Sequence, residues 1–344
     1  MSTLQIGLAV GGVLLLAAVI AWNTWVARRN APRQAEAPAQ AVEPTAVPQP
    51  ESARQEPAFE APLAPLPAPE KRPHLDPLID VIAPIALEGV VSGEAALAAL
   101  PATRRVGSKP FAVEGLNASS KVWEMPVPGQ RYGAFQAGVQ LANRVGALNE
   151  IEFSEYVVKA QAFADAVNGT PEFPEMLDEV ARARELDQFA SAHDAQLGFT
   201  LRARTTAWSP GYVQQHAARL GFVAGVIPGR MVLAAASTGL PPVLGLSFDT
   251  QAALAEDPAQ SAIREVTLSL DVPQVDRSEQ PFVKLREAAL ALAAAMDGLI
   301  TDDNGQVLVR DAMDLVGAEL ETLYDTLDAR DLSAGSPQAR RLFS

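Results

Sequence analysis

The chain has 344 residues, a formal net charge of −14 at neutral pH and no cysteine. The acidic charge argues against a nucleic-acid-binding protein, because such binding needs clustered lysine and arginine to displace counterions. The lack of cysteine excludes disulfide scaffolds, thiolate zinc sites and cysteine nucleophiles. The three histidines, His74, His193 and His216, offer little material for a catalytic or metal-binding cluster.

Residues 4–26 predict a membrane-spanning helix. They contain no ionisable side chain, and at about 1.5 Å per residue they can cross the ~30 Å hydrocarbon core. Trp22 and Trp25 lie at the end of this run, arginines follow from Arg28, and no basic residue precedes it, so the rest of the chain is expected in the cytoplasm. A cleaved signal peptide would need its basic residues before the apolar run. Residues 1–30 are therefore predicted to be an uncleaved N-terminal anchor, with a buried core helix as the alternative.

Residues 31–74 predict a disordered linker. Eleven prolines occur between Ala31 and Pro73, mixed with alanine, glutamate and glutamine. This composition buries too little apolar surface to offset the entropy of ordering. Fully extended, the segment would reach on the order of 100 Å. It is either a spacer that lets a head domain reach a partner or a tolerated stretch with no length requirement.

The residues after 75 repeat one order of elements in two passes. In the second pass, Leu197, Phe199 and Leu201 alternate with smaller or polar residues, as in a strand with one buried face. Ser209 followed by Pro210 predicts a helix start. The first pass is expected to have strands at 78–85, 110–116, 121–126 and 132–141 and helices at 93–100, 151–167 and 174–192. The second pass continues with strands at 230–235, 243–248, 265–273 and 307–309 and helices at 281–298 and 311–328.

The predicted fold class is therefore α+β, with antiparallel sheets that carry helices on one face. We expect two tandem repeats, at 75–192 and 193–330, and a disordered tail at 331–344. Two unrelated α+β stretches would give the same order of elements and stay open as the alternative.

The second pass resembles the C-terminal domain of the ZipA family of bacterial cell-division membrane anchors. The matching stretches, within residues 195–328, are LGFTLRA, SPGYVQQHAARLGFVAG, REVTLSLDVP, FVKLREAALALAAAMDGLITDD and DAMDLVGAELETLYDTL. The order of span, proline-rich tether and head is also similar to the family. The pass at 75–192 departs from the usual single-domain pattern.

This resemblance implies a split β-α-β fold whose open sheet face forms a shallow apolar groove for the C-terminal tail of FtsZ, the tubulin-like division GTPase. It implies a non-enzymatic adaptor without a cofactor, anchored once in the bacterial cytoplasmic (inner) membrane, with its head in the cytoplasm at the division septum. Carried over by strand, the groove candidates are Met231, Leu233, Leu246, Phe248, Thr267 and Ser269. Ser269 stands where the family tends to place an aromatic residue, and for each apolar candidate ordinary core is the alternative.

A second functional hypothesis belongs to a different class. In it, the chain is a membrane-tethered structural or regulatory protein whose duplicated head binds another envelope or cell-wall-synthesis protein. Residues 301–305 superficially resemble a calcium loop, but the distal bidentate glutamate is missing and a turn is expected. The sequence leaves the oligomeric state open.

Overall fold

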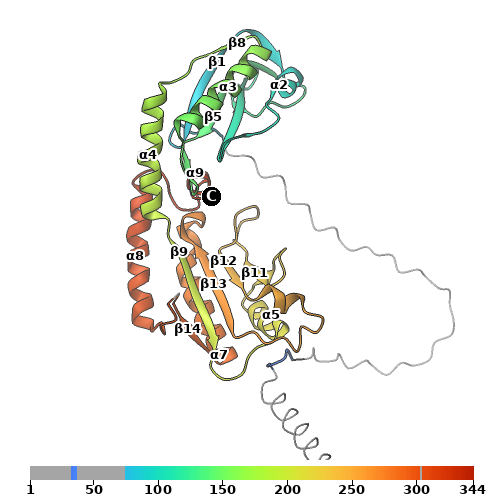
Figure 1. The fold of residues 1–344 in the computed structure, drawn as a ribbon, viewed down its shortest axis with the longest axis vertical. Coiled ribbons are helices and arrows are strands. Elements are labelled where there is room, and N and C mark those ends of the chain that lie inside the picture. The colour runs from blue at the N-terminus through green and yellow to red at the C-terminus, as the bar shows by residue number, and fades with distance from the viewer. Residues whose placement is uncertain (1–31, 37–73, 303) are drawn as a thin grey trace, which may run out of the picture. The chain divides into compact units, whose positions relative to one another are not determined.

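The computed structural model describes residues 32–36, 74–302 and 304–344 (Figure 1). In these residues two six-stranded antiparallel sheets, each with helices packed against it, and one small two-stranded sheet make up the α+β fold. The described residues form two units. The first unit contains residues 74–196, 271–280 and 314–344, and the second contains residues 32–36, 197–270, 281–302 and 304–313.

The first sheet has the strand order β2-β3-β5-β1-β8, and β4 pairs with β3. β1 pairs antiparallel with both β5 and β8, so it lies between them. The elements are β1 Asp80–Ser92, α2 Gly93–Ala99, β2 Arg105–Val106, β3 Lys109–Asn117, β4 Trp123–Glu124, β5 Arg131–Gln140, β6 Ala142–Asn143, β7 Gly146–Ala147, α3 Glu150–Ala166, β8 Gly169–Pro171, α4 Met176–His193 and α9 Pro337–Leu342, with 3₁₀ turns at Val272–Gln274 and Arg277–Glu279.

Helix α3 covers one face of the first sheet because both surfaces are aromatic. The rings of Phe135 on β5 and Phe163 on α3 pack edge to face with centroids 5.1 Å apart. The hydroxyl of Tyr156 donates to the carbonyl of Ala137 at 2.9 Å. The helix begins with a capping box formed by Asn149 and Glu152.

The second sheet has the strand order β10-β11-β12-β13-β9-β14, so β9 lies between β13 and β14. Ser209 caps α5 and Pro210 is its first residue, as the sequence predicts. The elements are β9 Gln196–Ala203, α5 Pro210–Arg219, β10 Val223–Ala224, β11 Arg230–Leu233, β12 Leu244–Ser247, α6 Thr250–Leu254, β13 Glu265–Asp271, α7 Pro281–Met296, β14 Gly298–Thr301 and α8 Arg310–Asp328, whose first four residues lie in this unit and whose remainder lies in the first.

The C-terminal residues correct the expectation of a disordered tail at 331–344. They contain helix α9, capped by Ser336, and the side chains of Leu342 and Phe343 are buried. The nearby amide of Gln274 donates to the carbonyl of Phe343 at 2.7 Å. Burial in the first unit therefore orders a segment whose sequence looks like a polar tail.

Other boundaries also differ from the sequence-based ones. The predicted strand at 307–309 is replaced by a single bridge between Val307 and Thr301, while the last strand, β14, follows α7 directly. Residues 32–36, expected to belong to the linker, pack against the second unit. Neither unit is one continuous stretch, in contrast to the predicted repeats at 75–192 and 193–330.

Within the described ranges, no helix has the length and apolar character needed to cross a membrane. The predicted span at residues 4–26 lies outside those ranges, as does the linker from residue 37 to residue 73.

Candidate functional site

The second sheet separates the six predicted groove residues onto two faces. Met231 pairs with Leu246, and Leu246 pairs with Leu268, so these three side chains share a face. That face is the core, because Leu268 is fully buried and Leu246 is 1% exposed. Leu233, paired with the buried Leu244, belongs to the same face.

Phe248 is also core, with 7% of its surface exposed, and Met231 is 5% exposed. This corrects the expectation that the apolar candidates line one groove with Thr267 and Ser269. Three of the four apolar side chains are buried, and successive residues of a strand point to opposite faces. Of the alternatives the sequence allowed for Met231, Leu246 and Phe248, ordinary core is the one found.

Thr267 and Ser269 lie on the opposite, open face of the second sheet. Ser269 pairs with Gly245 and Thr267 with Ser247, and Gly245 pairs in turn with Val232. Ser269 is exposed, and its four neighbours are half-buried. We call these five residues, Val232, Gly245, Ser247, Thr267 and Ser269, the open strip.

The open strip carries small and mostly polar side chains. A Cβ added at Gly245 would lie 2.6 Å from the hydroxyl oxygen of Ser269, so even the smallest side chain would crowd its neighbour. Beside it, the guanidinium of Arg202 on β9 pairs with the carboxylate of Glu265 on β13 at 3.2 Å. A surface of this kind offers a bound peptide few apolar contacts.

The helices of this unit pack on the other face. The ring of Phe282 on α7 meets that of Phe199 on β9 with centroids 6.3 Å apart. Phe199 is buried, as is Leu201 two residues along the same strand. The open strip therefore faces away from α7.

In the first unit, the sheet face that corresponds to the open strip is partly covered by Leu75. A Cβ added at Gly138 on β5 would lie 2.5 Å from a methyl group of Leu75, so Leu75 sits directly over the strand. The backbone N–H of Leu75 also donates to Glu114 at 3.1 Å. This contact anchors the residues that precede β1 across β3.

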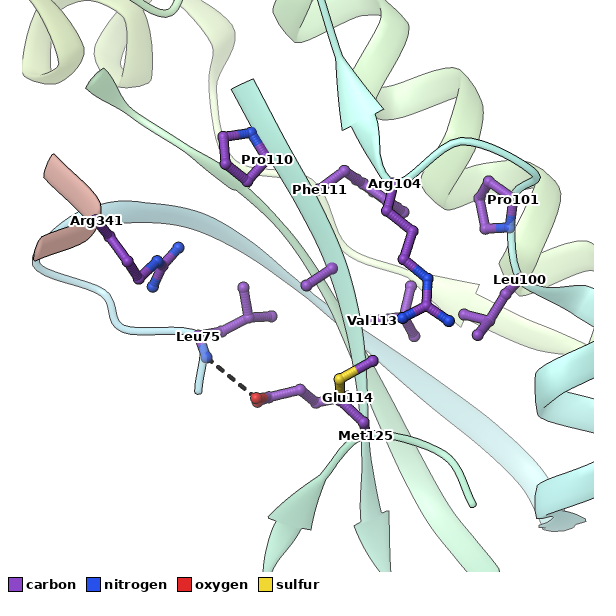
Figure 2. A pocket seen from close by; sticks show the side chains of 11 residues that line it. Leu75, Leu100, Pro101, Arg104, Pro110, Phe111, Val113, Glu114, Met125 and Arg341 are labelled. Atoms are coloured by element: carbon purple, nitrogen blue, oxygen red, sulfur yellow. Dashed lines mark hydrogen bonds between the residues drawn. The ribbon is translucent and has the colours of Figure 1, made fainter. Parts of the chain in front are cut away.

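A cleft of about 220 Å³ runs along β3 in the first unit. Figure 2 shows Leu100, Pro101 and Arg104 on one side of this strand, Leu75 and Arg341 on the other, and Met125 towards the end of the cleft. Residues 110–114 of β3 form its floor. Its walls are mostly apolar, as is usual for binding clefts.

The cleft lies where the outer edge of β3 lacks a partner strand. β2 pairs only with Lys109 and Pro110, and β4 pairs only with Gly115 and Leu116. Among the described residues, no strand pairs with 111–114 on this edge. The N–H of Phe111 donates to the carbonyl of Arg104 at 3.0 Å, so the loop after α2 closes one end.

The charged groups that line the cleft are largely satisfied internally. Glu114 is 3% exposed and accepts from the Gln136 amide at 2.8 Å in addition to the bond from Leu75. The Nδ1 atom of His74 lies 3.0 Å from the same carboxylate. Arg341 is paired with Asp80. Arg104 is the lining residue whose charge makes no ion pair with any described residue.

Sequence reasoning missed this cleft. Its one local signal is Glu114, an acidic residue inside the strand Phe-Ala-Val-Glu-Gly-Leu. The described residues contain no cluster of histidine and carboxylate side chains that could hold a metal ion.

No protein-family model matches the chain, and no curated protein matches it either.

Proposed function

We propose that the chain is a ZipA-like, non-enzymatic adaptor that binds the C-terminal tail of FtsZ and tethers the division ring to the cytoplasmic membrane. The observation that carries this proposal is the open strip, an accessible sheet face in the unit that resembles the family. A peptide laid across such a face gains mainly from the apolar surface it buries, at roughly 25 cal/mol per Å² less the cost of its ordering. Because the strip is mostly polar, most of the apolar surface buried on binding must come from the peptide.

The strand order supports a finer proposal, that both units are copies of a split β-α-β fold. In the first unit α3 connects β5 to β8, and the opening strand β1 lies between them. In the second unit α7 connects β13 to β14, and the opening strand β9 lies between them. A long helix, α4 or α8, follows in each case. The same strand order and the same place of the connecting helix in both passes are what a duplication would produce.

The membrane part of the proposal rests on the sequence alone. The uncharged run at 4–26 and the arginines after it favour a single span with the head in the cytoplasm. Placement at the septum follows from the proposed partner.

The experiment measures binding of a fluorescent FtsZ C-terminal tail peptide to the full chain in lipid nanodiscs, by fluorescence anisotropy. We expect micromolar binding, and we expect Ser269→Lys to weaken it about tenfold, or about 1.4 kcal/mol. The added side chain would lie on the open strip beside Gly245, and Ser269 is exposed, so the fold should tolerate it. Val226→Lys, at a fully exposed position of the same unit, is the matched control. No binding by the wild-type chain, or an equal loss in both variants, would count against the open strip.

The cleft along β3 favours the second candidate function, a tethered structural or regulatory protein whose head binds another envelope or cell-wall-synthesis protein. Its apolar walls beside an unpaired strand edge suit an extended segment that adds to β3 as a strand. Met125→Lys, which puts a charge into the cleft, separates this function from the first.

A further inference from the structure

A short segment from the beginning of the chain packs against the second unit. Residues 32–36, drawn in blue in Figure 1, lie beside α5. Arg33 forms a parallel bridge with Trp208. The N–H of Arg33 donates to the Ala207 carbonyl at 2.7 Å, and its carbonyl accepts from the N–H of Ser209 at 2.9 Å. On its other side Trp208 exchanges two backbone hydrogen bonds with Ile263, both 2.8 Å, so Arg33 completes a small three-stranded arrangement.

The side chain of Arg33 reaches the end of α7. Its guanidinium donates to the carbonyl of Met296 at 3.2 Å and pairs with the carboxylate of Asp297 at 3.1 Å. The indole N–H of the fully buried Trp208 donates to the same carbonyl at 2.8 Å. A cation is favoured there because the last carbonyls of a helix carry partial negative charge.

A second set of contacts holds the end of the segment. The amide of Gln215 on α5 accepts from the N–H of Glu36 and donates to its carbonyl, both at 3.0 Å. The carboxylate of Glu36 lies 3.3 Å from Arg219. The side chain of Gln215 therefore binds the backbone of this segment, and Arg219 binds the side chain of Glu36, as on a peptide-binding surface.

We infer that this surface is a docking site for the chain's own residues 32–36 and that it holds the second unit close to the membrane. The inference rests on the membrane anchor of the proposed function. Only residues 27–31 separate the end of the predicted span at Val26 from Pro32. Even fully extended, residues 27–31 reach about 20 Å from the end of the span. A tether that continued to residue 73 would allow a distance on the order of 100 Å.

Residues 37–73 then connect the docked segment of the second unit to the first unit. The distance of the second unit from the membrane therefore does not depend on the length of residues 37–73. The partner of the second unit is thus captured near the lipid surface.

The chain has no cysteine, so an engineered disulfide tests the docking directly. A Cβ added at Gly211 on α5 would lie 3.7 Å from the Cβ of Ala35, within the range of roughly 3.5–4.5 Å found in disulfides. We expect Ala35→Cys with Gly211→Cys, in the full chain in native membranes, to form the intrachain disulfide in most molecules on mild oxidation, measured by gel mobility and mass spectrometry. Ala35→Cys with Ser269→Cys, on the open face, is the control and should stay below a tenth of that yield. Equal yields in both pairs would overturn the docking.

A second measurement tests the distance. Energy transfer from a dye on Val226→Cys to labelled lipid in vesicles should stay the same when residues 45–64 are deleted, and it should fall when Arg33→Ala and Glu36→Ala are combined. A rise in transfer on the deletion would overturn the inference, because it would mean that the linker sets the distance. A chain that forms the disulfide but does not sediment with membranes would overturn the anchor, and with it the stated distance, and would leave the docking supported. A chain that sediments without forming the disulfide would overturn the docking alone.

Discussion

Asp80 and Arg341 lie 261 residues apart in sequence and form a two-point ion pair in the first unit. The Asp80 side chain is fully buried, and Arg341 approaches its two oxygens at 2.5 and 2.9 Å. Burial raises the pKa of Asp80, while the hydrogen bond and the charge of Arg341 oppose that rise. A carboxylate in this position is tolerated because a cation and the N–H of Asp76, at 2.8 Å, both satisfy it.

Arg341→Met should destabilise the first unit by about 3 kcal/mol at pH 7, because it leaves a buried carboxylate without its counterion. The loss should depend on pH in a defined direction. Without Arg341 the folded-state pKa of Asp80 rises further, while the unfolded chain keeps its ordinary value. The destabilisation caused by Arg341→Met is therefore largest at pH values above the pKa that Asp80 has in the folded variant. It decreases as the pH falls below that pKa. Urea unfolding of the full chain at pH 7 and pH 5 measures both effects.

Arg340→Met is the matched control for this change. Arg340 is the neighbouring arginine on α9, it is half-exposed, and its side chain pairs with no described carboxylate. It should change stability by no more than about 0.5 kcal/mol. Asp80→Asn combined with Arg341→Met should recover part of the loss. An equal loss for Arg341→Met at both pH values would contradict the role given to the Asp80 carboxylate.

Single residues also explain why the groove face could not be predicted from sequence. In β11 Met231, Val232 and Leu233 are three apolar residues in a row, so alternation alone does not say which side chains face inward. The pairing of β11 with β12, and of β12 with β13, determines which side chains face inward. This strand register depends on residues far apart in the sequence. Phe248→Asp would therefore remove a core side chain and does not report on peptide binding.

At the scale of elements, the helices with local signals were predictable. Helix α3 ends at Ala166, with Val167 as its C-cap and Asn168 in a left-handed conformation before Gly169, close to the predicted end at residue 167. The start of α5 was likewise predictable from its N-cap Ser209 and its first residue Pro210. These elements depend on contacts within a few residues of the chain, which a sequence pattern can encode.

Elements ordered by distant contacts were missed. α9 has six residues, too few to be a stable helix alone, and it forms because Leu342 and Phe343 find a buried site. Segment 32–36 forms its bridge with Trp208, about 175 residues away along the chain. In both cases the partner lies far along the chain, where local patterning carries no information.

Truncation of the chain after Ser336 should destabilise the first unit by about 3–5 kcal/mol, because it removes two large buried side chains and the Arg341 ion pair. Hydrogen exchange should speed up in β5, whose Gln140 amide donates to the carbonyl of Arg341 at 2.8 Å. Exchange in β12 of the second unit should be unchanged. Deletion of the exposed Ser344 alone is the control, and unchanged protection of β5 after the longer truncation would contradict a structural role for α9.

At the scale of the whole molecule, the two units are interleaved in sequence. The chain passes from one to the other after residues 196, 270, 280 and 313. A fragment cut at the predicted boundaries, 75–192, would lack the residues of α9 and so the partner of Asp80. Neither unit is obtained whole by a single cut, so functional tests belong on the full chain with point variants.

Localisation of a fluorescent fusion of the full chain separates the two candidate functions, since each places the decisive contact in a different unit. If the open strip binds the tail of FtsZ, the fusion should form a mid-cell ring, Ser269→Lys should reduce the ring several-fold and leave a uniform membrane signal, and Met125→Lys should leave the ring intact. If the β3 cleft binds an envelope protein instead, Met125→Lys should change the distribution and Ser269→Lys should not, because the lysine in that variant lies in the other unit. Val226→Lys controls for the added charge. A uniform membrane signal for the wild-type chain would remove the division role and leave the tethered structural protein as the better account.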